Sequence, residues 1–199
     1  MPLIITSSAK KVSIMAISAA LYASLFALSF IVTLPNFTLL YLPIILLGVF
    51  PVWFGWSGLV GSVIGALIAG VFVENLGSFA WVEMVTTLII YGLNWLLINR
   101  KAVEAKTKIG LISLLGAYAL SLFVGLAYIL WQETFFPPLW TPQGAIAILV
   151  PTFVLNFIIA AVICPALIRT VSPKMKNWGM YSGTFWERRS GTKTRATGS

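Results

Sequence analysis

Apolar runs separated by short polar or proline-containing stretches predict six membrane-spanning helices. The runs cover residues 12–34, 37–49, 57–73, 80–98, 109–131 and 145–168. A helix needs about 20 mostly apolar residues to cross the hydrocarbon core of a bilayer, and the run at 37–49, which contains Pro43, is the shortest. We therefore predict an all-α integral membrane protein with a six-helix domain at 12–168, an N-terminal segment at 1–11 and a basic tail at 169–199.

The composition supports a membrane protein and excludes several kinds of chemistry. Of the 199 residues, 59% are hydrophobic and only 9% are charged, whereas about a quarter of a typical soluble domain is charged. The chain has no His, no Asp and a single Cys, Cys164, so an imidazole metal site, a His-carboxylate pair and an internal disulfide are all excluded. A metalloenzyme is therefore not expected, and we predict no cofactor.

The basic residues predict how the helices are oriented. All thirteen Lys and Arg fall in three groups, at residues 10–11, at 100–108 and from 169 onward, and six crossings place these groups on one side of the membrane. The loops on the other side carry Glu74 and Glu133 and no basic residue. By the positive-inside rule both termini lie in the cytoplasm. The net charge of +8 is then explained by topology, and no nucleic-acid partner is expected.

The tail combines basic and aromatic residues, with Lys174 and Lys176 close to Trp178, Tyr181 and Trp186. One interpretation is an interfacial segment that lies on anionic membrane lipid. The other is a docking site for a cytoplasmic partner protein. The sequence leaves both interpretations open.

Small residues recur at helical spacing on the first and third predicted helices. Ala16, Ala20 and Ala23 share one face of the first helix, where they would let another helix approach closely. That helix could belong to this chain or to a separate subunit. On the third helix the small residues recur every four positions, at Ser57, Gly61, Gly65 and Ala69. We expect this second face to pack inside the protein.

The fourth predicted helix carries a stripe of polar residues. Its members, at spacings of four, four and three, are Glu83, Thr87, Tyr91 and Asn94. On a helix this spacing confines them to an arc of roughly 80°. Ionisable residues inside a membrane usually face a cavity or a partner, although such a stripe can instead serve hydrogen bonds between helices.

Further polar and aromatic residues are placed where they could complete an outward-facing pocket. They are Tyr128 on the fifth helix, Asn156 on the sixth, and Trp131, Glu133 and Trp140 in and around the Pro-rich loop between these helices. The aromatic residues could form a lid over a flat ligand or a belt at the membrane interface. Because the charges on this side are Glu and none is basic, a neutral or cationic aromatic ligand is favoured.

Three features of the chain occur together in one known family. A basic start leads into an Ala-rich first helix at 10–21, a short second helix reaches Gly48, and a Gly-rich segment follows at 54–62. With these features and six helices in 199 residues, the chain resembles the substrate-binding S-components of energy-coupling factor (ECF) importers of vitamins and micronutrients. The resemblance covers roughly residues 10–170.

The resemblance implies a capture subunit in the plasma membrane of a prokaryote. Such S-components bind a small molecule from outside and associate with a transmembrane coupling subunit and two cytoplasmic ATPases, which hydrolyse the ATP. On this chain Ala16, Ala20 and Ala23 would be the docking face, and the polar and aromatic residues named above would contact the ligand. Glu83, Asn156 and a loop Trp together resemble thiamine-binding members, so thiamine, its pyrimidine precursor or a flavin is the expected substrate.

Two other classes of function stay open on the sequence. A membrane sensor or scaffold would recruit a cytoplasmic protein through the basic tail and would need no pocket. A small membrane enzyme acting on lipid would need clustered acids, His residues or a metal, and the chain has only five Glu and no His. The importer subunit is the favoured prediction.

Overall fold

The computed structural model describes residues 7–29, 33–34, 37–38, 40–72, 80–99, 107–135 and 141–186. Its elements in chain order are α1 (Ser7–Ser29), β1 (Thr33–Leu34), β2 (Phe37–Thr38), the 3-10 helix η1 (Leu42–Leu46), α2 (Phe50–Phe54), α3 (Trp56–Phe72), α4 (Trp81–Leu97), α6 (Lys108–Phe135) and α7 (Pro142–Asn177). β1 and β2 pair in a short antiparallel ladder. Apart from this ladder, the regular structure in the described residues is helical, which confirms the predicted helical class.

Three described helices are long and apolar enough to cross a membrane, which gives the chain the character of a membrane protein. They span Ser8–Ser29, Lys108–Gln132 and Pro142–Asn177, in α1, α6 and α7. The two further apolar helices, α3 and α4, have 17 residues each, which corresponds to a length of about 26 Å. Both lie within one residue of the ranges that the sequence predicts.

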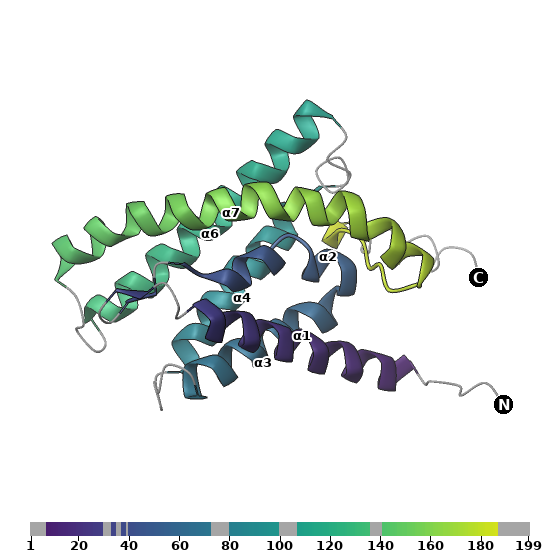
Figure 1. The fold of residues 1–199 in the computed structure, drawn as a ribbon, viewed down its shortest axis with the longest axis horizontal. Helices are drawn as coiled ribbons and strands as arrows, with labels where there is room; N and C mark the ends of the chain where they lie inside the picture. Colours follow the sequence, from purple (N-terminus) through teal and green to yellow (C-terminus); the bar gives the residue numbers. More distant parts are fainter. Residues whose placement is uncertain are drawn as a thin grey trace.

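The helices form an open arc around a central piece of chain (Figure 1). α1 packs against α3, α3 against α4, α4 against α6, and α6 against α7. Inside the arc, η1 contacts both α1 and α7, while α2 contacts both α3 and α4. We call residues 40–49, which include η1, the central segment. The hydrophobic core is built around this segment, in which Ile44, Leu47 and Val49 are completely buried.

Small residues bring α3 directly onto the backbone of α1. A Cβ atom added to Gly61 would lie 2.5 Å from the carbonyl oxygen of Met15, and one added to Gly65 would lie 2.6 Å from that of Ala19. The predicted internal packing of the small-residue face on α3 is therefore confirmed. Such a close approach provides the van der Waals contact that holds helices together in lipid.

The prediction of one continuous helix at 37–49 is wrong. The chain there forms β2, the five-residue η1 and a turn, and α2 then begins at Phe50. A proline stands in the first turn of each short helix, Pro43 in η1 and Pro51 in α2. Proline fits the first turn of a helix but interrupts its interior. The two prolines therefore divide the apolar run into short pieces.

α7 extends beyond both ends of the predicted sixth helix. Thr141 caps its start, where the side-chain oxygen accepts a backbone hydrogen bond at 3.1 Å, and Pro142 occupies the first turn. The helix then continues past Ile168 to Asn177. Pro165 lies inside α7 without ending it. The first part of the predicted tail is therefore helical.

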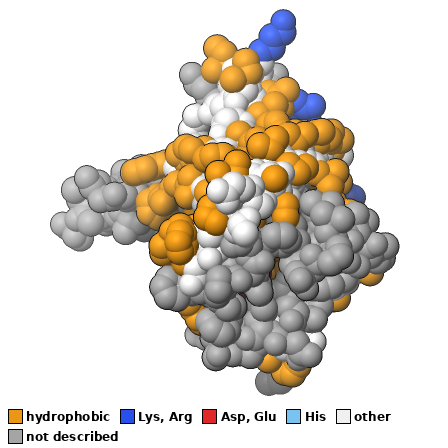
Figure 2. Space-filling model, turned by 90° about the vertical axis from the view of Figure 1, so that its left-hand side faces the viewer, with side chains coloured by type: hydrophobic (Ala, Val, Ile, Leu, Met, Phe, Trp, Pro, Cys, Tyr) orange, Lys and Arg blue, Asp and Glu red, His pale blue; other side chains and the backbone are white. Residues whose placement is uncertain are grey.

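Hydrophobic side chains cover much of the outer surface. On α7 an apolar stripe is exposed at every fourth residue, at Ile146, Val150, Val154, Ile158 and Val162. Figure 2 shows the end of the molecule that lies on the left of Figure 1, where hydrophobic side chains cover much of the described surface and Lys and Arg lie at its edge. Exposed apolar surface of this extent is typical of a protein that faces lipid.

The described end of the tail folds back onto the bundle. After α7, the backbone amides of Ser182 and Gly183 donate to carbonyl oxygens of α2 at 2.8 and 3.0 Å. The indole of Trp186 donates to a carbonyl oxygen in the last turn of α4 at 2.9 Å. We call residues 178–186 the C-terminal strap, since they tie the ends of α2 and α4 to the end of α7.

The described Lys and Arg residues belong to the first turns of α1, the start of α6 and the last three turns of α7. They are Lys10, Lys11, Lys108, Arg169, Lys174 and Lys176. Lys10 near the start of α1 donates to the carbonyl oxygen of Gly179 in the strap at 3.0 Å, so α1 begins where α7 ends. Glu83 lies in the first turn of α4. Because the last turn of α4 meets the strap, Glu83 lies at the opposite end of α4 from the strap.

Replacing Gly61 by Ala should lower the unfolding temperature of the detergent-solubilised protein. The added methyl group would collide with the backbone of Met15 and the Cβ of Ser18, and overpacking of this kind costs about 1–3 kcal/mol. Gly116→Ala is the matched control, because a Cβ atom there meets nothing within 4 Å. It should be neutral or slightly stabilising, since Ala is the better helix former. Equal unfolding temperatures for the two variants would contradict the close contact between α1 and α3.

Candidate functional site

The polar stripe of α4 lies inside the bundle. Glu83, Thr87, Tyr91 and Asn94 are each at most 3% exposed. Their side chains form hydrogen bonds with α1 and with the central segment. The helical spacing places all four on one face of α4. The outer half, Glu83 and Thr87, and the inner half, Tyr91 and Asn94, have different hydrogen-bond partners.

The inner half of the stripe holds the backbone of the central segment. The hydroxyl of Tyr91 donates to the carbonyl oxygen of Pro43, and the side-chain amide of Asn94 donates to that of Leu47 at 3.0 Å. The thiol of Cys164 on α7 donates to another carbonyl oxygen of this segment at 3.4 Å. Backbone that is not regular helix is tolerated at membrane depth only where surrounding protein satisfies it. Tyr91 and Asn94 were expected to contact a ligand, and in the structure they support this backbone.

The outer half of the stripe is a chain of hydroxyl groups that ends at a carboxylate. Tyr41 donates to Oε2 of Glu83 at 2.8 Å. The hydroxyl of Tyr41 is also hydrogen-bonded to that of Tyr22 on α1, which lies 2.6 Å from the hydroxyl oxygen of Thr87. We call these four residues the Glu83 cluster. Through it α1, the central segment and α4 meet in one hydrogen-bonded group.

Asn156 of α7 is joined to this cluster through the backbone of Tyr41. Its side-chain oxygen accepts the amide of Tyr41 at 2.8 Å, and its side-chain amide donates to the carbonyl oxygen of Thr152 at 2.8 Å. On the other side, the hydroxyl of Ser29 on α1 accepts the amide of Leu42 at 2.9 Å. The start of the central segment is therefore fixed by two helices.

The predicted aromatic residues lie on the outside of α6 or beyond the described residues. Trp131 is 54% exposed, and its ring centroid lies 6.5 Å from that of Tyr128 and 5.9 Å from that of Phe135. Within the described residues, these three side chains form no hydrogen bond with the Glu83 cluster. The side chain of Glu133, and the whole of Trp140, lie outside the described residues. Such a row of rings is typical of the aromatic belt at a membrane interface.

Tyr22 and Tyr41 are central to the cluster, and sequence reasoning did not single them out. Each is the one tyrosine of its apolar run, at 12–34 and 37–49. A buried tyrosine hydroxyl usually finds a hydrogen-bond partner. A single tyrosine in an apolar run therefore predicts a buried hydrogen bond of its hydroxyl, although it does not identify the partner.

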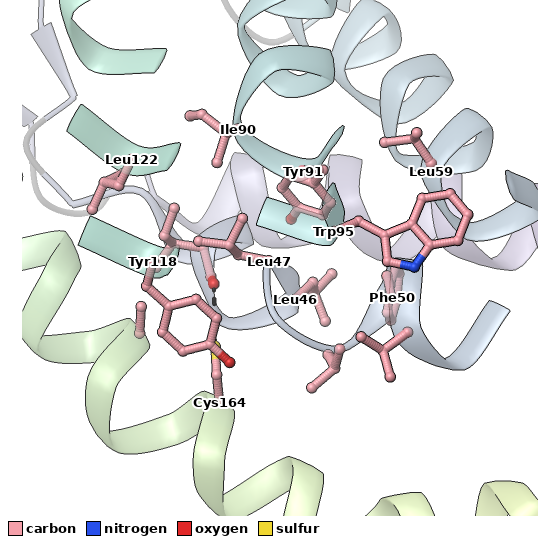
Figure 3. Close-up of a cluster of buried hydrophobic side chains, with 14 of the residues drawn as sticks. Leu46, Leu47, Phe50, Leu59, Ile90, Tyr91, Trp95, Tyr118, Leu122 and Cys164 are labelled. Carbon is pink, nitrogen blue, oxygen red and sulfur yellow. Dashed lines mark hydrogen bonds between the residues drawn. The ribbon is translucent and has the colours of Figure 1, made fainter. Parts of the chain in front are cut away.

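A second buried contact explains why residue 48 is glycine. The hydroxyl of Tyr118 on α6 occupies the space where a Cβ atom of residue 48 would stand. Figure 3 shows Tyr118 beside Leu47 and Cys164, where α6 and α7 meet the central segment. Only glycine lets the central segment approach the Tyr118 ring this closely.

Glu83 is a buried carboxyl group with no basic partner in the described part of the chain. Its only hydrogen bond with a described residue comes from Tyr41. The C-terminal strap, to which Lys10 is bound, meets the last turn of α4, roughly 20 Å from Glu83 along the helix axis. The first turn of a helix favours a negative charge, but burying an unpaired carboxylate still costs free energy. The site therefore favours a cation or a hydrogen-bond donor.

Comparisons with protein-family models, with curated proteins and with solved structures found no match to this chain. The function must therefore be argued from the chain's own residues. Among these, the Glu83 cluster is the most unusual feature, since it places an acidic group inside an apolar bundle.

Removing the hydroxyl of Tyr91 should destabilise the protein. Tyr91→Phe removes the hydrogen bond that the Tyr91 hydroxyl donates to the carbonyl oxygen of Pro43, and a buried hydrogen bond contributes about 0.5–1.5 kcal/mol. Tyr128→Phe is the control, because Tyr128 is only partly buried and forms no hydrogen bond with a described residue. Thermal unfolding in detergent should give a lower midpoint for Tyr91→Phe alone. If both variants unfold together, the hydroxyl of Tyr91 does not support the central segment.

Proposed function

We propose that this chain is the substrate-capture subunit of an ECF-type importer and binds a small vitamin-like compound at the Glu83 cluster. The observation that carries the proposal is the carboxyl group of Glu83, which lies 3% exposed inside an apolar bundle with Tyr41 as its only described partner. Ionisable groups in such positions usually serve a ligand or an ion pathway. ATP hydrolysis in this scheme belongs to separate partner subunits.

The groups around Glu83 favour a neutral or cationic aromatic ligand. The ring of Tyr41 packs edge-on against that of Phe26, with centroids 5.1 Å apart, and against that of Tyr22 at 6.4 Å. Aromatic rings beside a carboxylate suit a cation, which gains both ionic and cation–π attraction. Thiamine carries a positive charge on an aromatic ring and fits this chemistry. Its pyrimidine precursor and a neutral flavin are the alternatives.

The proposed topology has six crossings, made by α1, the η1–α2 region, α3, α4, α6 and α7, with both termini in the cytoplasm. Two observations support it: the described Lys and Arg belong to the start of α1, the start of α6 and the last turns of α7, and α1 begins where α7 ends. The positive-inside rule then assigns the basic end to the cytoplasm. The Glu83 cluster would face the outside of a prokaryotic plasma membrane, where a capture subunit meets its substrate.

α1 offers a surface for the transmembrane coupling subunit. One face of the helix packs on α3 through Met15 and Ala19. Ala16 and Ala20 are exposed and Ala23 is partly exposed. These small side chains would let a partner helix approach closely. We propose that the coupling subunit docks on this face and carries the two cytoplasmic ATPases.

The proposal can be tested by identifying what the protein holds. Small molecules released from the detergent-purified protein would be identified by mass spectrometry, and Trp fluorescence would be titrated with thiamine, its pyrimidine moiety and riboflavin. Quenching by one compound at nanomolar concentration would support a capture subunit and name its cargo. No released ligand, and no quenching by a wide vitamin panel, would contradict it and favour a sensor or scaffold that recruits a partner.

Glu83→Gln should weaken the binding of a cationic ligand by about 1.5–3 kcal/mol, the range for a hydrogen bond to a charged group. Gln keeps the size of the side chain and removes its charge. The affinity of wild type and variant would be compared by fluorescence titration with thiamine. Unchanged affinity would exclude Glu83 from the binding site.

Ala16→Trp or Ala20→Trp should abolish uptake into cells while leaving ligand binding by the purified subunit intact. A bulky ring on this face would block the approach of the coupling subunit, whereas α1 would still pack on α3. Ala147→Trp is the matched control, since Ala147 is exposed on α7, and it should leave both activities unchanged. Loss of binding together with uptake would mean that the alanine face packs inside the protein.

A further inference from the structure

Tyr41 is the one partly exposed member of the Glu83 cluster. Glu83, Thr87 and Tyr22 are buried, at 3%, 1% and 0% exposure, whereas Tyr41 is only partly buried. Within the cluster, the way from the surface to the carboxyl group therefore begins at Tyr41. A ligand that approaches Glu83 therefore meets the side chain of Tyr41 first.

The hydroxyl of Tyr41 makes the same kind of contact with Glu83 that a ligand would make. It donates a hydrogen bond to Oε2 at 2.8 Å, and the carboxyl group has no other hydrogen-bond partner among the described residues. A cationic or N–H group of a ligand would be attracted to this same oxygen. The tyrosine and the ligand therefore compete for one acceptor.

Two hydrogen bonds around Tyr41 do not depend on its hydroxyl. Its backbone amide is bonded to Asn156 at 2.8 Å and does not depend on the hydroxyl. When the hydroxyl leaves, Tyr22 keeps its 2.6 Å hydrogen bond with Thr87. Tyr22 loses its hydrogen bond with the Tyr41 hydroxyl, whereas Glu83 loses its only partner among the described residues, and Glu83 is the group that the ligand would satisfy.

We infer that Tyr41 is a surrogate ligand: its hydroxyl satisfies Glu83 while the site is empty and turns away when a ligand binds. This inference rests on the proposed capture function and adds a residue that sets its affinity. When a group of the protein competes with the ligand, only the molecules with an open site can bind. The observed affinity is then the intrinsic affinity multiplied by the fraction of molecules with an open site. Removing the competing hydroxyl therefore has the opposite effect to removing a ligand contact.

The first test needs no ligand and measures access to the cluster. Thr87→Cys is introduced together with Cys164→Ala, so that the thiol at position 87, buried beside Tyr22, is the only one in the chain. Its rate of modification by a cationic methanethiosulfonate is then compared with Tyr41 present and with Tyr41→Phe. Loss of the hydrogen bond to Glu83 should raise the rate about tenfold or more.

Leu122→Ala is the control for general loosening in this test, because it removes a buried side chain from the core on α6. It should leave the rate of modification close to that of the parent protein. Equal rates with and without the Tyr41 hydroxyl, or an equal increase with Leu122→Ala, would overturn the inference.

The second test uses thiamine as the probe and measures affinity by Trp fluorescence. Tyr41→Phe should bind thiamine about tenfold more tightly than wild type. Tyr181→Phe, in the C-terminal strap where the ring lies under Lys176, should bind with unchanged affinity. Weaker or unchanged binding by Tyr41→Phe would overturn the inference. If neither wild type nor Tyr41→Phe binds thiamine, the ligand assignment fails, and the modification rates still decide whether Tyr41 closes the cluster.

Discussion

The rest of the structure depends on one requirement, which is that the backbone of the central segment must find hydrogen-bond partners inside an apolar bundle. A long helix satisfies its own carbonyl groups, but a chain interrupted at Pro43 and Pro51 does not. The neighbouring helices meet this need with polar side chains, including Tyr91 and Asn94 on α4 and Cys164 on α7. Much of the polar stripe of α4 thus serves to hydrogen-bond the irregular backbone of the central segment.

The same requirement explains where a functional site can form. At Pro43 and Leu47 the side-chain donors of α4 are matched by backbone acceptors, and the side-chain oxygen of Asn94 is buried without a hydrogen-bond partner among the described residues. At Tyr41, just before η1, the acceptor is instead the side chain of Glu83 and the donor is the partly buried side chain of Tyr41. A backbone carbonyl cannot be released without unfolding, whereas a side-chain partner can be exchanged. The Glu83 cluster is therefore the part of the stripe that is suited to binding.

Much of the fold could be predicted from the sequence where a feature is local. The ranges of α3 and α4 follow from uninterrupted apolar runs, and the internal packing of one face of α3 follows from Gly61 and Gly65 at helical spacing. The prolines of the second apolar run indicated an interruption. Hydrophobic periodicity, however, does not predict the conformation of a segment that is neither helix nor strand. The continuation of α7 past Ile168 was missed because charge in the tail suggested that the apolar helix had ended.

The candidate site was predictable only in part, because its geometry depends on pairs far apart in the chain. Spacing placed Glu83 and Thr87 on one face, and this is a property of a single helix. Their partners Tyr22 and Tyr41 come from two other elements, and no pattern within a run encodes which phenol meets which acceptor. The backbone partners of Tyr91 and Asn94 were not predictable for the same reason, because a polar side chain on a helix looks alike whether it faces a ligand or a backbone.

The C-terminal strap has a consequence for how the protein is made. A ribosome releases the chain from its N-terminus, so α2 emerges long before residues 178–186. Until Ser182 and Gly183 emerge, the carbonyl oxygens of Trp53 and Val52 lack the donors that they have in the finished protein. The interior of the bundle is thus completed by the last part of the described chain, and a nascent chain that stops at the end of α7 carries an open core.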